Sequence, residues 1–262
     1  MRKEVQLQPE SCRFYFGKGE LSACILGPVQ AESVQQRYVC ASLVKKIKEL
    51  EEKGAIVHGN EILVIPQSSA ETEGLQPEAA GCSYVIRFQE AKEEGDFVPY
   101  IKITGNGFEN PSLANLFGFP YVRIKEEEPD REPAGNQFFV YTGPADRIDE
   151  EAARRAVSAV LRFLTRMGIL RYTSHSGYIA SIIRDEDLSI VRSDKSGLYR
   201  RTVQPGCEVH RGEVLALLTD PQDGETLGEI LSPSDGIVFF ARTASEIMEG
   251  TIIFKIIRRL HE

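Results

Sequence analysis

The stretch LSACILGPVQAESVQQRYVCASLVKKIKELEEKGAIVHGNEILVIP, residues 21–66, decides the fold. Its first part, Ser22–Gly27, is an apolar run typical of a buried strand. Apolar residues then recur at three- and four-residue steps over Val34–Leu50, which predicts a helix. A second apolar run, Glu61–Pro66, predicts the returning strand. Open α/β sheets place their sites at the carboxyl ends of such strands, so we expect the site at Gly27–Ser33 and at the ends of the neighbouring strands.

Further strands and helices follow this β–α–β unit. Asp149 fits a helix N-cap because Glu150 and Glu151 would lie in the first turn, where negative charge suits the helix dipole. The alternation of strands and helices indicates an α/β domain over residues 1–170. Its later strands are expected at 84–88, 97–104, 121–124 and 137–141, and its later helices after Asn110 and Asp149.

The overall composition is that of a soluble globular protein. The formal net charge of −8 argues against nucleic acid or an anionic membrane as a partner. The five cysteines have no CxxC spacing, so they give no metal-site signal and fit reduced thiols in a cytoplasm. The sequence has no apolar run long enough for a transmembrane helix and no signal-peptide core, so we expect a cytoplasmic protein.

The sequence pattern changes in the last third of the chain, from long helical segments to short strands and turns. We expect a linker over residues 171–196 and a small all-β domain over residues 197–262, because turn signals there recur every 8–12 residues. The turns in 203–212 and 232–236 resemble those of barrel-sandwich domains, the fold of biotinyl and lipoyl carriers. Carriers need a lysine on the exposed hairpin before the Ser-Pro turn, and the sequence has none between Lys195 and Lys255. A swinging-arm role is therefore excluded, and we expect a structural or assembly module.

The whole chain resembles the succinylglutamate desuccinylase/aspartoacylase family, relatives of the zinc carboxypeptidases. The resemblance runs in order through residues 62–66, 84–103 and 137–170 and closes with the barrel. It implies an α/β fold of the zinc-carboxypeptidase type, a mixed sheet flanked by helices, plus a C-terminal barrel-sandwich domain. It also implies cleavage of N-acyl amides, or in some branches esters, at one zinc ion. That chemistry needs two histidines, a carboxylate and a bound water, with a nearby glutamate as general base.

The positions that match the family's zinc ligands lack imidazole in this chain. The family takes two ligands from a His-Gly-(Asp/Asn)-Glu loop, and here Gln30 stands at the histidine and Ser33 at the glutamate. Sliding the alignment by one residue rescues Glu32 but loses the histidine position. The third ligand position is Gln89, and a carboxamide is a poor zinc ligand. We expect no metal and a remnant polar cleft made of Gln30, Glu32, Ser33, Gln89 and Glu90.

One other segment spells the zinc motif almost perfectly. His58-Gly59-Asn60-Glu61 follows the long helix and runs into a strand, whereas a ligand loop should follow a strand and open a helix. The other three histidines lie in the linker, the barrel and the C-terminal tail. We interpret the segment as a turn, since motif matches outside their structural context are mostly chance. A zinc site using His58 and Glu61 remains the alternative.

Three functions stay open. The first is a non-catalytic relative that binds a small molecule or acts as a regulatory or assembly subunit, as a homo-oligomer or with an active family member. It is favoured because the segment 70–82 also lacks the family's substrate-binding arginines and the strand 138–143 lacks its general-base glutamate. The second is a zinc-dependent deacylase that hydrolyses N-acyl amino acids with His58 and Glu61. The third is a purely structural interaction protein.

Overall fold

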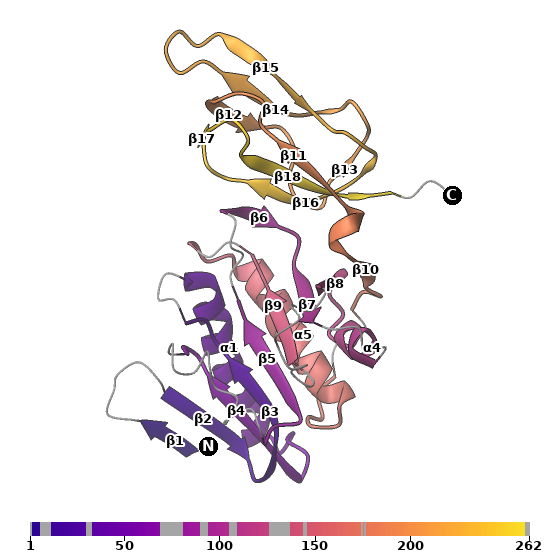
Figure 1. The fold of residues 1–262 in the computed structure, drawn as a ribbon. Helices are drawn as coiled ribbons and strands as arrows, with labels where there is room; N and C mark the ends of the chain where they lie inside the picture. Colours follow the sequence, from indigo (N-terminus) through magenta and orange to yellow (C-terminus); the bar gives the residue numbers. More distant parts are fainter. Residues whose placement is uncertain are drawn as a thin grey trace. The chain divides into compact units, whose positions relative to one another are not determined.

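The computed structural model of the chain describes residues 2–5, 12–29, 33–68, 81–89, 94–104, 109–125, 137–143, 146–173, 175 and 177–259. These residues divide into two compact units, drawn in Figure 1. The first unit spans Met1–Glu90 and Pro99–Ile182, and the second spans Ala91–Val98 and Ile183–Glu262.

The larger sheet is mixed and contains nine strands among the described residues, in the order β1-β2-β4-β3-β5-β9-β7-β8-β10. Its strands are β1 (Arg2–Val5), β2 (Cys12–Gly17), β3 (Gly19–Leu26), β4 (Gly59–Ile65), β5 (Tyr84–Phe88), β7 (Tyr100–Thr104), β8 (Tyr121–Lys125), β9 (Gln137–Tyr141) and β10 (Ser181–Ile183). The helices of the first unit are α1 (Val34–Glu52), α4 (Glu109–Asn115) and α5 (Glu150–Arg166).

The β–α–β unit predicted from residues 21–66 is confirmed as β3, α1 and β4. β3 pairs in parallel with both β4 and β5, and β5 pairs in parallel with β9. β2 runs antiparallel to β4 and β7 antiparallel to β9, so the sheet is mixed, as expected. Asp149 caps α5 as predicted, because its side chain accepts a hydrogen bond of 2.9 Å from the Ala152 amide.

The helices α1 and α5 cover one face of this sheet and share one apolar core with it. Residues at helical spacing in α1, such as Leu43 and Ile47, and in α5, such as Val160 and Leu164, are buried there. The opposite face carries a second apolar cluster around Cys24 and the ends of β3 and β4. The central strands are therefore apolar on both faces, which explains their unbroken hydrophobic runs.

The sequence prediction of one strand over residues 97–104 is wrong. The segment contains two strands in different sheets: β6 (Gly95–Phe97) pairs with β16 of the second unit, and β7 pairs with β8 and β9. The break falls at Val98 and Pro99. Pro99 has no backbone N–H for a ladder hydrogen bond, so a strand cannot run through this position unbroken.

The second unit consists of two antiparallel sheets around one apolar core. One sheet has the order β11-β18-β16-β13, with β6 beside β16, and the other has the order β15-β14-β12-β17. Its further elements are η1 (Asp185–Asp187), β11 (Leu188–Arg192), β12 (Gly197–Arg201), β13 (Glu208–Val209), β14 (Val214–Thr219), β15 (Thr226–Leu231), β16 (Gly236–Arg242), β17 (Glu246–Ile247) and β18 (Ile252–Arg258).

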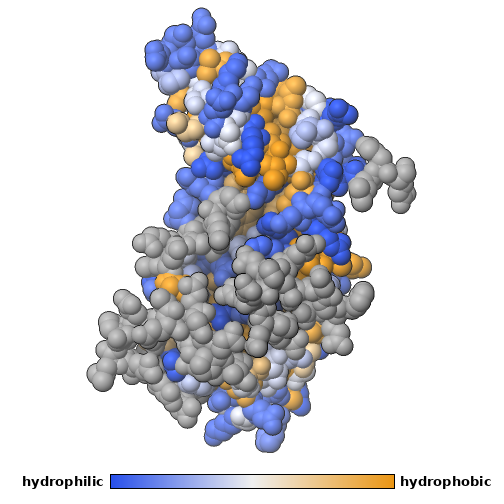
Figure 2. Space-filling model, in the orientation of Figure 1, coloured by the Kyte–Doolittle hydropathy of each residue, from blue (hydrophilic) through white to orange (hydrophobic). Residues whose placement is uncertain are grey.

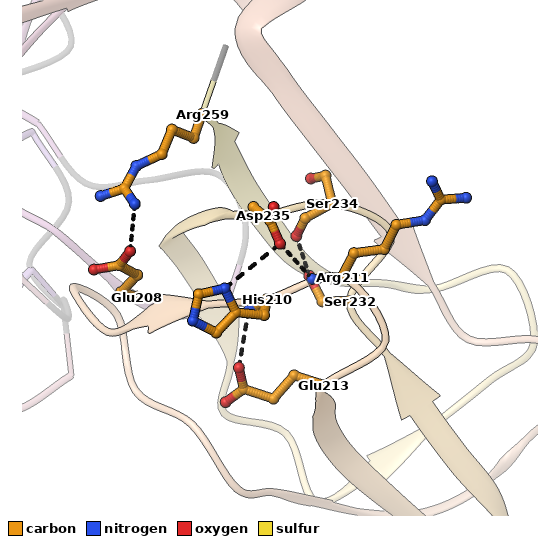
Figure 3. A network of polar contacts seen from close by, with 8 residues as sticks. All are labelled: Glu208, His210, Arg211, Glu213, Ser232, Ser234, Asp235 and Arg259. Carbon is orange, nitrogen blue, oxygen red and sulfur yellow. Dashed lines mark hydrogen bonds and ion pairs between the residues drawn. The ribbon is translucent and has the colours of Figure 1, made fainter. Parts of the chain in front are cut away.

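Asp235 holds the two sequence-predicted turns of this unit together (Figure 3). Its Oδ1 accepts a hydrogen bond of 2.8 Å from the Arg211 amide and lies 3.6 Å from His210 Nδ1. Its backbone oxygen accepts one of 3.1 Å from the Arg259 amide. The turn after β13 and the turn before β16 are thus fixed by backbone donors, so their polar residues have a structural role.

The turn between β14 and β15 spans residues 220–225. Asp220 and Asp223 shape it, since their carboxylates accept hydrogen bonds of 2.7 and 2.8 Å from the amides of Gln222 and Glu225. The turn is exposed and contains no lysine.

Figure 2 shows hydrophobic residues grouped over the strands of the second unit. No helix in the described part of the chain has the length and hydropathy to cross a bilayer.

Candidate functional site

Four parallel strands end at the same edge of the larger sheet, which we call the carboxyl edge. It comprises the residues that follow β3, β4, β5 and β9. Backbone hydrogen bonds join neighbouring segments there: Gly27 donates to Ile65 (2.7 Å), Ser68 donates to Pro28 (3.0 Å), and Gln89 donates to Val140 (3.0 Å). This is the place where an open α/β sheet positions a ligand site.

The sequence predicted five residues for this cleft, and two of them are described. Ser33 is buried and forms the N-cap position of α1, and Gln89 directly follows β5. Both therefore lie at the carboxyl edge. Gln30, Glu32 and Glu90 lie outside the described residues.

Gln89 belongs to an aromatic cluster that the sequence did not reveal. Tyr141 donates a hydrogen bond of 3.0 Å from its Oη to Gln89 Oε1. The Tyr141 ring stacks on Tyr100 with 4.5 Å between centroids. Lys102 Nζ lies 5.5 Å from the Tyr141 ring centroid and 4.6 Å from that of Phe139. Gln89 therefore has a fixed orientation, and its carboxamide oxygen is already used.

A row of cations crosses the same face of the sheet. The register pairs Arg87 with Phe139, Phe139 with Lys102, and Lys102 with Arg123. Paired residues share a face, and neighbouring strands are about 4.8 Å apart. Arg87 alternates with the core residues Ile86 and Phe88, so the row lies on the face opposite α1 and α5. The row places three cationic side chains on the sheet face that also carries Gln89.

Two neighbouring glutamines at the start of α1 have opposite environments. The Gln35 carboxamide is fully paired: its Nε2 donates to the Asp149 carbonyl and its Oε1 accepts from the Asp149 amide, both at 2.9 Å. It thereby ties the N-terminus of α1 to that of α5. Gln36 is also fully buried, yet neither its Nε2 nor its Oε1 has a hydrogen-bond partner in the described structure.

Two hydroxyls at the carboxyl edge are likewise buried without a hydrogen-bond partner in the described structure. Ser68 Oγ, after β4, and Thr142 Oγ1, after β9, are buried and have no hydrogen-bond partner among the described atoms. Leaving one such group unpaired costs about 1–3 kcal/mol. Buried polar groups in native proteins are nearly always satisfied, so each of these atoms is a candidate contact for a polar ligand or an ordered water.

A solvent-open hollow of about 480 Å³ lies beside the same helix. It is formed at the end of β4 by Pro66 and Gln67, by the first turns of α1, and by Ile148. Val34, Tyr38 and Ile148 are partly exposed in its wall. The space next to the N-terminus of α1 is therefore apolar, with the cation of Arg37 at its border.

The alternative zinc residues lie at the other end of β4. His58 is exposed in a turn directly before the strand, so it is separated from the carboxyl edge by roughly 20 Å of extended chain. His58 and Glu61 line a hollow of about 460 Å³ together with Glu51, whose Oε1 accepts a hydrogen bond of 2.8 Å from the Gly17 amide. Within the described ranges, no three His, Cys, Asp or Glu side chains form a group able to hold a metal ion.

No family model and no curated protein matches this sequence. Solved structures do match it along nearly its whole length. A succinylglutamate desuccinylase/aspartoacylase from Rhodobacter sphaeroides has a TM-score of 0.75 at 15% identity, over 95% of this chain and 90% of that one. The fold is that of the succinylglutamate desuccinylase/aspartoacylase proteins. The expected fold is thus confirmed.

Two further structures with this succinylglutamate desuccinylase/aspartoacylase fold cover both chains almost completely. The apo ectoine utilization protein EutE (DoeB) from Ruegeria pomeroyi has a TM-score of 0.76 at 13% identity, over 98% of this chain and 99% of that one. A succinylglutamate desuccinylase/aspartoacylase from Shewanella frigidimarina has a TM-score of 0.73 at 13% identity, over 95% and 92%. At these identities the comparison establishes the fold.

The donor atoms at the carboxyl edge do not fit the zinc ion that the succinylglutamate desuccinylase/aspartoacylase fold implies. Its described buried polar side chains are hydroxyls and carboxamides, whereas zinc in proteins is held by imidazole, thiolate and carboxylate. The sequence contains four histidines, and none of them follows β3, β4, β5 or β9. The edge can therefore bind a ligand through hydrogen bonds, but it offers no imidazole to a cation.

Proposed function

We propose that this chain is a zinc-free, non-hydrolytic relative of the succinylglutamate desuccinylase/aspartoacylase proteins. Its carboxyl edge binds a small polar ligand, and the protein acts as a binding or regulatory subunit, alone or beside an active relative. The observation that supports this proposal is the set of buried, neutral polar atoms at the carboxyl edge without hydrogen-bond partners among the described residues, those of Gln36, Ser68 and Thr142.

The distribution of histidines supports the loss of hydrolysis. His58 is at the amino end of β4, His175 follows α5 with its carbonyl bound by Arg162, and His210 lies in a turn of the second unit. His261 is outside the described residues. A hydrolytic zinc needs at least two imidazoles beside an open position for water, and the strand ends supply none.

The test is a hydrolysis assay with N-acyl amino acids, run with added zinc and again with a chelator. We expect no turnover above the uncatalysed rate in either condition. Turnover that zinc supports and the chelator abolishes would overturn the proposal. A variant with His58→Ala then shows whether such activity comes from the hollow at the amino end of β4.

The second candidate function, a deacylase, has one observation in its favour. His58, Glu61 and Glu51 line one hollow, so an imidazole and two carboxylates are present on a single surface. A fourth group would have to come from another chain, because the described residues contain no complete metal-binding group. Loss of all hydrolysis in the His58→Ala protein would support this candidate.

An assembly role has a different basis, the apolar surface of the second unit. Four large apolar side chains are exposed there: Ile190, Leu198, Leu231 and Met248. Ile190 and Leu198 lie in different sheets, so a partner that covers one of them would bury only part of this set. Light scattering behind gel filtration tests self-association directly. We expect a particle larger than one chain, and a monomer at every concentration would refute a homo-oligomer.

A further inference from the structure

The N-terminus of α1 differs from an ordinary capped helix end. Ser33 occupies the N-cap position but makes no side-chain cap hydrogen bond, and no acidic residue lies in the first turn. The first N–H groups of any helix have no acceptor within the helix, and its dipole places partial positive charge there. By contrast, α5 has an Asp149 cap and two glutamates in its first turn.

A second, independent observation lies at the same edge. Gln36 is in the first turn of α1, fully buried, and both polar atoms of its carboxamide are without partners. Thr142 Oγ1 and Ser68 Oγ, from the ends of β9 and β4, are buried and without partners as well. Ser68 is joined to Pro28, at the start of the loop that leads to α1, by its backbone hydrogen bond. Gly143 is close to Gln35, since a Cβ at that glycine would lie 3.9 Å from Gln35 Nε2.

We propose that this edge binds a small oxyanion, a phosphate or carboxylate group, where the fold's relatives would hold a cation. The inference rests on the proposed zinc-free function and names the ligand class of that site. The helix N-terminus supplies N–H donors and positive potential. The Gln36 amide and the Thr142 hydroxyl supply further donors.

The two unpaired atoms of the Gln36 carboxamide favour monohydrogen phosphate over a carboxylate, because one is an acceptor and the other is a donor. Gln36 Oε1 is an acceptor and needs a donor, whereas Gln36 Nε2 needs an acceptor. Monohydrogen phosphate offers both, because it carries unprotonated oxygens and one P–OH group. The site thus holds an anion, whereas a zinc centre holds a cation.

The experiment measures the affinity for inorganic phosphate by calorimetry in chloride buffer at fixed ionic strength, with acetate as a second probe. Wild type should bind phosphate, and acetate more weakly. Gln36→Met and Thr142→Val, which keep the side-chain shape, should each weaken phosphate binding about tenfold or more. Thr165→Val is the matched control, because Thr165 Oγ1 already donates to the Leu161 carbonyl within α5, and its affinity should equal that of wild type.

Four outcomes decide the matter. Phosphate binding that Gln36→Met weakens and Thr165→Val leaves intact supports the oxyanion site. Absence of phosphate binding in a folded, zinc-free wild type overturns the oxyanion site while the zinc-free function stands. One tightly held zinc per chain overturns both. Acetate binding equal to phosphate binding contradicts the preference for monohydrogen phosphate over a carboxylate.

Discussion

Gln35 and Gln36 offer a matched pair of substitutions with opposite expected signs. Both side chains are fully buried and they are adjacent in the first turn of α1. Gln35→Met removes two hydrogen bonds of 2.9 Å to the Asp149 backbone, so the free energy of unfolding should fall by about 1–3 kcal/mol. Gln36→Met removes two atoms that have no partner, so the free energy of unfolding should rise by about 1–3 kcal/mol in phosphate-free buffer.

The assay is urea denaturation of wild type and both variants, followed by circular dichroism. The two variants should differ in the free energy of unfolding by about 2–6 kcal/mol, well above the error of the extrapolation. Phosphate should then stabilise wild type but not the Gln36→Met protein, because a ligand that binds only the folded state adds to its stability. Equal destabilisation by both substitutions would refute the reasoning, since Gln36 would then be satisfied in the protein.

Four further predictions test other parts of the structure. Arg162→Met should lower the free energy of unfolding by about 2–4 kcal/mol, measured by urea denaturation, because the buried guanidinium donates to the carbonyls of His175 and Phe117. In native protein at pH 8, iodoacetamide should modify the exposed Cys207 but not Cys40, as followed by mass spectrometry, because burial raises the pKa of the Cys40 thiol. Stability should also fall as the pH rises above the ordinary thiol value of 9.0, since the unfolded thiol ionises first. His58→Ala should leave the urea midpoint and phosphate affinity unchanged, because this exposed side chain is remote from the carboxyl edge.

The parts of the fold with strong periodicity could be predicted from the sequence. The apolar steps in α1 and the Asp149 cap of α5 are local signals, and the structure confirms both elements. The break at Pro99 was a local signal too. The apolar run around it favours one continuous strand, although proline removes a ladder donor. Where β6 pairs depends on residues far away in the sequence, and no local pattern reports that.

The location of the candidate site could be predicted from the sequence, but only some of the residues that form it could. Parallel strand ends must share one edge, so the location followed from the β–α–β unit. Gln36 carried an overlooked signal: it is in helical register with Cys40, Leu43 and Ile47, which marks a polar group on a buried stripe. The cation row could not be predicted, because the order β5-β9-β7-β8 brings together strands that are not consecutive in the chain.

Metal analysis of the protein purified without chelator tests the central claim most directly. If the carboxyl edge is a hydrogen-bonding site built from neutral groups, zinc measured by inductively coupled plasma mass spectrometry should be far below one ion per chain. The content should also stay there after incubation with zinc and gel filtration. One zinc ion per chain, retained through gel filtration and lost in a Gln36→Met or Ser33→Ala variant, would contradict the account.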